Sequence, residues 1–225
     1  MEEKYSKFIG VGSEGIETLN SFKNKLEKNF SFEEINLNQD VDKEYVRALL
    51  DGVDILVLAY NSEDKKVRDI VKAISFMAVE RRVLCLGLDS SLKENKDEMG
   101  LDQEIKINKY NFDKIQDILN IVVESVDEDV FLAIDLTDLR DIFTKENAVT
   151  YSYEEFNHNE EIENIVKALT EETYSTEGQV AKKKAILFYE LEKELIGNNH
   201  ERSYNSNIEY KFKIVEVIKD ILKNN

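Results

Sequence analysis

The first candidate for chemistry is a glycine-rich turn near the start of the chain, in the stretch "FIGVGSEGIETL". Gly10-x-Gly12-x-x-Gly15 follows an apolar stub and precedes a helical pattern. Such a turn can seat a phosphate at a helix N-terminus, because glycine lets backbone N–H groups approach the anion closely. Two acids, Glu14 and Glu17, lie where the phosphate would sit. Each favours the helix dipole by about 0.3–1 kcal/mol and repels phosphate.

The residues alone leave two interpretations of this turn open. A Rossmann dinucleotide site needs an acid at the end of the second strand to bind the ribose. Here Asn36 and Asn38 occupy that position, and Asp40 falls later. The two histidines, His158 and His200, lie in polar segments and suggest no catalytic dyad. An NAD(P)-binding protein and an ordinary α/β domain with a tight glycine turn both remain possible.

The elements that must position this turn alternate along the first half of the chain. Apolar runs predict strands at 4–12, 30–38, 53–60, 82–88 and 104–109, and helical periodicity predicts helices at 15–29, 42–52, 64–81 and 112–126. The run "VDILVLAY" is almost wholly apolar, which is typical of a central strand covered on both faces. This alternation predicts an α/β fold with a parallel, Rossmann-like sheet.

The second half of the chain has a different character. Strand-like patterns at 148–156 and 182–194, an amphipathic helix at 159–174 and an apolar stripe within 208–225 predict a smaller α+β region. We therefore expect three parts: an N-terminal Rossmann-like domain at 1–111, a connecting central helix at 112–130, and a reduced C-terminal domain at 131–225.

The charge and composition of the chain exclude some kinds of binding partner. The chain has 225 residues and a formal net charge of -17, which repels phosphate backbones and anionic lipid, so we expect neither nucleic acid nor membrane partners. Its single cysteine, Cys85, lies in an apolar run and is expected to be a buried hydrophobe. No apolar run approaches the roughly 20 residues needed to span a bilayer, and the N-terminus has no signal-peptide pattern. These features predict a cytoplasmic protein without a metal site.

A second motif, "AIDLTDLRDIF", lies at the start of the predicted C-terminal domain. Asp135 is suited to cap the helix that follows, and Asp138 would complete an acidic first turn. From the residues alone, both aspartates are helix-terminal groups.

Together these motifs resemble the FtsZ/tubulin family. FtsZ has a loop of the form IGVGGGGxNAV, which matches "IGVGSEGIETL", and a later motif N-x-D-F-A-D-V-R, which matches "AIDLTDLR" with both aspartates and the arginine kept. Phe112 matches the family's purine-stacking aromatic residue. The resemblance implies that Gly10, Gly12, Gly15 and Phe112 border a GTP site. It also implies that Asp135 and Asp138 act catalytically on the nucleotide of a neighbouring subunit.

One departure from the family bears on function. The GGGTGTG phosphate loop should follow "VDILVLAY", but "NSEDKKV" follows instead, with no glycine. Lys65 and Lys66 supply the only positive charge there. We therefore expect a divergent FtsZ/tubulin-like protein that binds GTP weakly or not at all. It would act through contacts with itself or with an FtsZ-like filament protein of the bacterial division cytoskeleton. An active GTPase of that cytoskeleton and an NAD(P)-binding protein are the alternatives.

Overall fold

The computed structural model describes residues 5–26, 30–93, 97–126, 135–143, 160–161, 163–165 and 167–168. The chain divides into two compact units, residues 1–149 and 150–225. In the second unit, the helical residues 163–165 and 167–168 fall inside the helix predicted at 159–174. The other elements predicted after residue 143 lie outside the described residues. The expected domain boundaries at 111 and 130 stay a prediction.

The first unit is built on a five-stranded parallel sheet with the order β2-β1-β3-β4-β5. Its strands are β1 (Tyr5–Val11), β2 (Phe30–Ile35), β3 (Val53–Tyr60), β4 (Leu84–Asp89) and β5 (Gln103–Lys106). Its helices are α1 (Gly12–Phe22), α2 (Lys43–Leu49), α3 (Lys65–Glu80), α4 (Phe112–Ser125) and α5 (Leu136–Ile142). The α/β class and the parallel sheet predicted from the apolar runs are confirmed.

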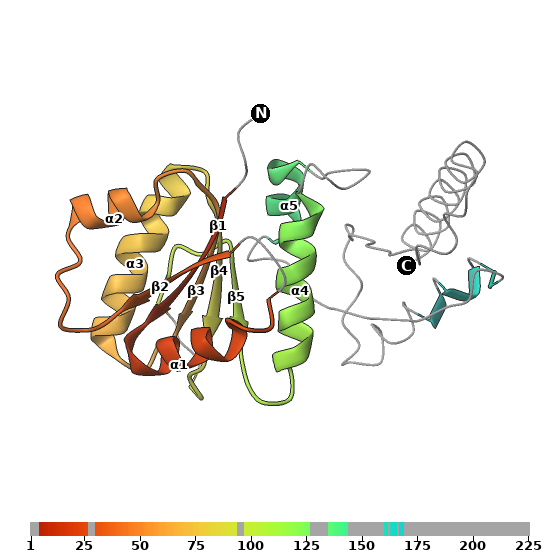
Figure 1. Cartoon of the computed structure of the whole chain (residues 1–225), viewed down its shortest axis with the longest axis horizontal. Helices are drawn as coiled ribbons and strands as arrows, with labels where there is room; N and C mark the ends of the chain where they lie inside the picture. The colour runs from red at the N-terminus through yellow and green to blue at the C-terminus, as the bar shows by residue number, and fades with distance from the viewer. Residues whose placement is uncertain are drawn as a thin grey trace. The chain divides into compact units, whose positions relative to one another are not determined.

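Both faces of the sheet are covered, which explains the uninterrupted apolar strands. Helices α2 and α3 lie on one side and α4 on the other (Figure 1). Alternate residues of β3 serve the two faces: Leu56, Leu58 and Tyr60 belong to the core under α2 and α3, and Ile55 and Val57 are equally buried. Cys85 is completely buried in β4, as expected of a small hydrophobe, and burial raises the pKa of its thiol.

The strand order sets the place of the candidate site. The direction in which strands are added to the sheet reverses between β1 and β3. Strand β2 lies on one side of β1, and β3, β4 and β5 follow on the other side. In open parallel sheets, ligands bind at such a reversal, outside the carboxyl ends of the strands. We call this end of the sheet the carboxyl edge. The glycine turn, which follows β1, lies at this edge.

Candidate functional site

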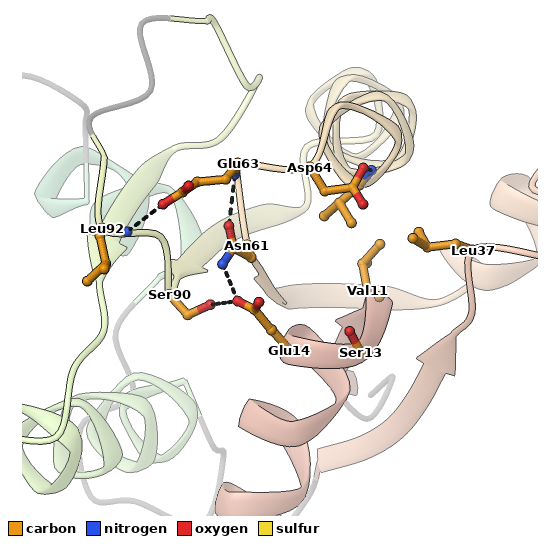
Figure 2. Close-up of a pocket in the computed structure, with 11 residues that line it drawn as sticks. Val11, Ser13, Glu14, Leu37, Asn61, Glu63, Asp64, Ser90 and Leu92 are labelled. Carbon is orange, nitrogen blue, oxygen red and sulfur yellow. Dashed lines mark hydrogen bonds between the residues drawn. The ribbon is translucent and has the colours of Figure 1, made fainter.

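A cavity of about 430 Å³ lies at the carboxyl edge of the sheet. Its wall comes from three segments: residues 11–14 at the junction of β1 and α1, residues that follow β3, and residues that follow β4. The residues after β3 are Asn61, Glu63 and Asp64, those after β4 are Ser90 and Leu92, and Leu37 and Val67 complete the wall (Figure 2). The sheet thus brings together segments that are far apart in the sequence. The cavity lies at the reversal of strand order, where a ligand site is expected.

The glycines of the turn are explained by packing. A Cβ at Gly15 would lie 2.2 Å from the carbonyl oxygen of Ala59, and one at Gly10 would lie 2.7 Å from that of Gly15. Gly12 has a φ of 72°, in the left-handed region that favours glycine. These glycines let α1 lie directly on β1 and β3, whether or not a phosphate is bound. Of the three, Gly12 alone is among the residues that line the cavity.

The helix after this turn begins earlier than predicted. The periodicity placed its start at Gly15, whereas α1 begins at Gly12. The prediction was wrong because glycine is a poor helix former, and the apolar stripe starts only at Ile16. The close approach of α1 to β3 stabilises the additional turn. As a result Ser13 and Glu14 lie in the first turn of the helix, with their backbone N–H groups at its N-terminal end.

Glu14 occupies the position where the three connections meet. Its Oε2 accepts a hydrogen bond from the side-chain amide of Asn61 and one from the Ser90 hydroxyl at 3.4 Å (Figure 2). Asn61 in turn accepts from the backbone N–H of Glu63 at 2.8 Å. The Glu14 carboxylate therefore joins the start of α1 to the connections after β3 and β4. Glu17, the other acid of the turn, is exposed and does not line the cavity.

The cavity is acidic. Glu14, Glu63 and Asp64 line it, and in the part of the chain that the structure describes no Lys or Arg does. The backbone N–H of Leu92 donates to Glu63 at 3.2 Å, and this bond together with the ion pair to Lys93 lowers the pKa of the Glu63 carboxyl. Lys66, expected to supply positive charge here, donates its ammonium group to the Leu37 carbonyl. The electrostatic field of this wall disfavours an anionic ligand.

Asp64 has a structural partner. Its carboxylate caps α3 by accepting from the backbone N–H of Lys66 at 2.7 Å, with a longer contact to that of Val67 at 3.4 Å. An Asp at this position satisfies amides that a helix start leaves without intrahelical partners. The amides at the start of α3 therefore already have an anionic partner from the chain itself.

A buried polar cluster that we did not predict lies beside the cavity. Asp89, at the end of β4, is completely buried and forms an ion pair with Lys106 of β5. Ser62 and Ser91 each donate a backbone N–H at 3.0 Å and a hydroxyl at 2.7 and 2.8 Å to its two oxygens. Burial alone would raise the pKa of Asp89, but these hydrogen bonds and Lys106 outweigh it and lower the pKa.

The residue types of this cluster are those of a serine–lysine hydrolase, but the geometry does not suit that chemistry. Lys106 directs its ammonium group to three acceptors, Asp89, the Ser91 hydroxyl and the Lys93 carbonyl. These three contacts match the three donors of an ammonium group and leave none of them directed at the cavity. Ser62 and Ser91 are buried and do not line the cavity. The cluster therefore has a structural role.

The second motif lies at the opposite end of the sheet. Asp135 caps α5 by accepting from the backbone N–H of Thr137 at 2.7 Å, and Asp138 is exposed in the first turn. Arg140 donates to the Val83 carbonyl at 3.1 Å, just before β4 begins. Figure 1 shows α5 at the end of the sheet where β1 starts. The predicted cap is confirmed, and a role of the two aspartates toward a neighbouring subunit stays a prediction.

Phe112 does not line the cavity. Its ring stacks on that of Phe22 with the centroids 4.1 Å apart, and the Lys25 ammonium lies 4.6 Å from its centroid. Phe22 also packs on Phe8, so Phe112 extends an aromatic cluster between the sheet, α1 and α4. The expected stacking on a purine stays a prediction, and in the structure described here the partner of this ring is Phe22.

Within the described residues, no three side chains of His, Cys, Asp or Glu come together in a way that could hold a metal ion. Nor does any described helix combine the length and apolar character needed to cross a membrane. His158 and His200 lie outside the described residues.

Comparison with solved structures finds a similar fold at low sequence identity. The chain is similar to the solved structure of a tryptophan-to-tyrosine mutant of FtsZ from M. jannaschii, with 11% sequence identity and a TM-score of 0.42. The match covers 63% of this chain and 62% of that chain, so it spans less than two thirds of the FtsZ. At this level the match carries no argument about activity. No family model matches the chain, and no curated protein matches it.

Proposed function

We propose that this chain is a divergent protein of the FtsZ/tubulin type in which GTP binding is lost or weak. It acts through contacts with itself or with an FtsZ-like filament protein. One observation carries the proposal: the Glu14 carboxylate lies at the start of α1 and is hydrogen-bonded to Asn61 and Ser90. A phosphate seated at the start of α1 would lie beside this carboxylate and be repelled by it. The motifs of the glycine turn and of residues 133–140 support the choice of family.

Electrostatics makes the cavity a poor nucleotide site. Two like charges about 4 Å apart repel each other by roughly 4 kcal/mol at the effective dielectric constant of a protein surface. A triphosphate at the start of α1 would face Glu14 and also approach Glu63, which pairs with Lys93, and Asp64, which caps α3. Among the described residues, no Lys or Arg lines the cavity. It would also have to break the hydrogen bonds that Glu14 makes. A Mg²⁺ ion would reduce the repulsion without supplying the missing donors.

The contact surface that we propose is the exposed first turn of α5. Arg140 anchors this helix, since it donates to the Val83 carbonyl and lies 3.7 Å from Asp102. Asp138 is exposed in the first turn of this helix, and α5 lies at the end of the sheet where β1 starts (Figure 1). A carboxylate on this turn suits a partner with cationic groups. If the first turn of α5 of one copy met the cavity of another, acids of the two copies would come together. We therefore expect self-association to require a divalent cation that bridges these acids, and Asp138 to supply one of them.

Sedimentation of the full chain tests this role. We expect association, with itself in Mg²⁺ or with purified FtsZ filaments, that does not change when GTP is added. Asp138→Asn removes the outward charge and keeps the Asp135 cap, so it should weaken the association. Glu17→Gln, which removes one charge from an exposed site on α1, is the matched control and should leave it unchanged. Association that appears only with GTP and is accompanied by hydrolysis would favour the active GTPase, and a tight NAD(P) complex would favour the dinucleotide-binding alternative.

A further inference from the structure

The buried Asp89 carboxylate connects two of the three segments that form the cavity. One oxygen accepts the backbone N–H groups of Ser62 and Ser91, both at 3.0 Å. The other accepts their hydroxyls at 2.7 and 2.8 Å. Ser62 lies between the lining residues Asn61 and Glu63, and Ser91 lies between Ser90 and Leu92. A single carboxylate thus fixes the backbone of both connections immediately beside the residues that line the cavity.

Lys106 ties this arrangement to β5. Its ammonium group bonds Asp89, lies 2.6 Å from the Ser91 hydroxyl and donates to the Lys93 carbonyl at 3.0 Å. A buried carboxylate needs such a partner, because an unpaired charge in the interior is strongly unfavourable. The hydroxyl oxygens of Ser62 and Ser91 lie 2.8 Å apart, so the two serines also contact each other. Its polar groups are satisfied by one another, without a ligand.

Ordering a loop costs about 1–2 kcal/mol of conformational entropy per residue. At a binding site, either the ligand or the protein must offset this cost. Here the bonds to Asp89 are internal, and they are stronger than neutral ones because the acceptor is charged. Asn61 and Ser90, one in each of the same two connections, also donate to the Glu14 carboxylate.

We infer that Asp89 is the positioning residue of the cavity: through Ser62 and Ser91 it holds the connections after β3 and β4 in place, so that the cavity keeps its shape without a ligand. This inference rests on the hydrogen bonds of Asp89 and not on the proposed function. It holds whether the cavity binds a nucleotide, another ligand or nothing.

Amide hydrogen exchange on the full chain, without added nucleotide, tests the inference. Asp89→Ala removes the carboxylate that accepts from both serines and from Lys106. The amides of Ser62 and Ser91 and of their neighbours in both connections should then exchange at least about tenfold faster, while the amides of β1 and β3 keep their protection. Asp102→Ala is the matched control, because Asp102 also accepts a backbone N–H, that of Cys85 at 2.8 Å, but at the other end of β4. It should leave both connections protected.

Three milder substitutions, at Ser91 and Lys106, keep the test decisive if Asp89→Ala does not fold. Ser91→Ala deletes one hydroxyl, and Lys106→Arg keeps the charge while Lys106→Met removes it. We expect Ser91→Ala and Lys106→Met to speed exchange in both connections together, and Lys106→Arg to preserve most of the protection. Unchanged exchange at Ser62 and Ser91 would overturn the inference, as would a rise of equal size across β1, β3 and both connections, which would mark Asp89 as a general stabiliser.

Discussion

The side-chain amide of Asn61 donates to the carboxylate of Glu14 and so joins the connection after β3 to the first turn of α1. This bond crosses the carboxyl edge at the reversal of strand order. It places a negative charge at the helix end where a phosphate would otherwise be favoured. The amide of Asn61 is thereby engaged by the protein's own acid.

Neutralising Glu14 should make the cavity more receptive to anions. Glu14→Gln keeps an acceptor oxygen for Asn61 and Ser90 and removes one negative charge. We expect weak binding of GTP or inorganic pyrophosphate to become about tenfold tighter, because one repulsive charge is lost. Glu17→Gln, three residues further along α1 and outside the cavity lining, should change it little. Calorimetric titration of both variants measures the difference, and an equal gain for both would show that net charge, not position, matters.

The packing account of the glycines predicts a large loss of stability for Gly15→Ala. The new methyl would lie 2.2 Å from the Ala59 carbonyl oxygen, so α1 would have to move off β3. We expect a loss of about 1–3 kcal/mol or more in the free energy of unfolding. Gly52→Ala is the control, since Gly52 has a φ of 69° but nothing within 4 Å of an added Cβ. It should lose only about 1 kcal/mol. Urea unfolding compares the two, and equal losses would contradict the account.

The two aspartates of residues 133–140 should differ in their effect on stability. Asp135→Ala removes the cap of α5 and should cost about 0.5–2 kcal/mol, whereas Asp135→Ser restores a capping oxygen and should recover most of it. Asp138→Ala changes an exposed side chain and should cost less than about 0.5 kcal/mol. Local hydrogen exchange in α5 measures these effects. A larger loss for Asp138→Ala than for Asp135→Ala would show that the assignment of the cap is wrong.

Acid should remove the stabilisation that Asp89 provides. Its pKa is lower in the folded chain than in the unfolded chain. The unfolded chain therefore takes up a proton first as the pH falls, and stability falls with it. The contribution is complete at neutral pH and is lost below about pH 4, near the usual aspartate pKa. We expect the difference in unfolding free energy between the wild type and Asp89→Asn to shrink between about pH 5 and about pH 3. A difference that stays constant over this range would contradict the assignment.

Much of the first unit follows from the pattern of apolar residues. The run at 53–60 predicted a central strand, and β3 has those bounds with its side chains buried on both faces. The inward residues predicted for the helix at 64–81, among them Val67, Ile70 and Ile74, are buried in α3. Periodicity succeeds here because burial on the two faces of a parallel sheet leaves a strong local signal.

The site was harder to predict because its contacts are not local. The clash of a Cβ at Gly15 with Ala59 exists only once α1 lies on β3. The Asp89 cluster joins segments that follow two neighbouring strands with Lys106 of a third strand. In the sequence, its residues look like the ordinary polar residues that end an apolar run. The one available signal was that both "AYNS" and "GLDSS" place serines directly after adjacent buried strands. The pairing of those strands is needed to see that the serines share one acid.

The most direct test of the central claim is a titration of the purified full chain with labelled GTP and Mg²⁺, with phosphate release followed in the same samples. Glu14 lies at the start of α1, where the glycine turn would seat a phosphate, and no described Lys or Arg lines the cavity. We therefore predict no binding below about millimolar GTP, a free energy weaker than about -4 kcal/mol, and no phosphate release. Binding at micromolar GTP with hydrolysis would contradict the account and identify the chain as an active GTPase.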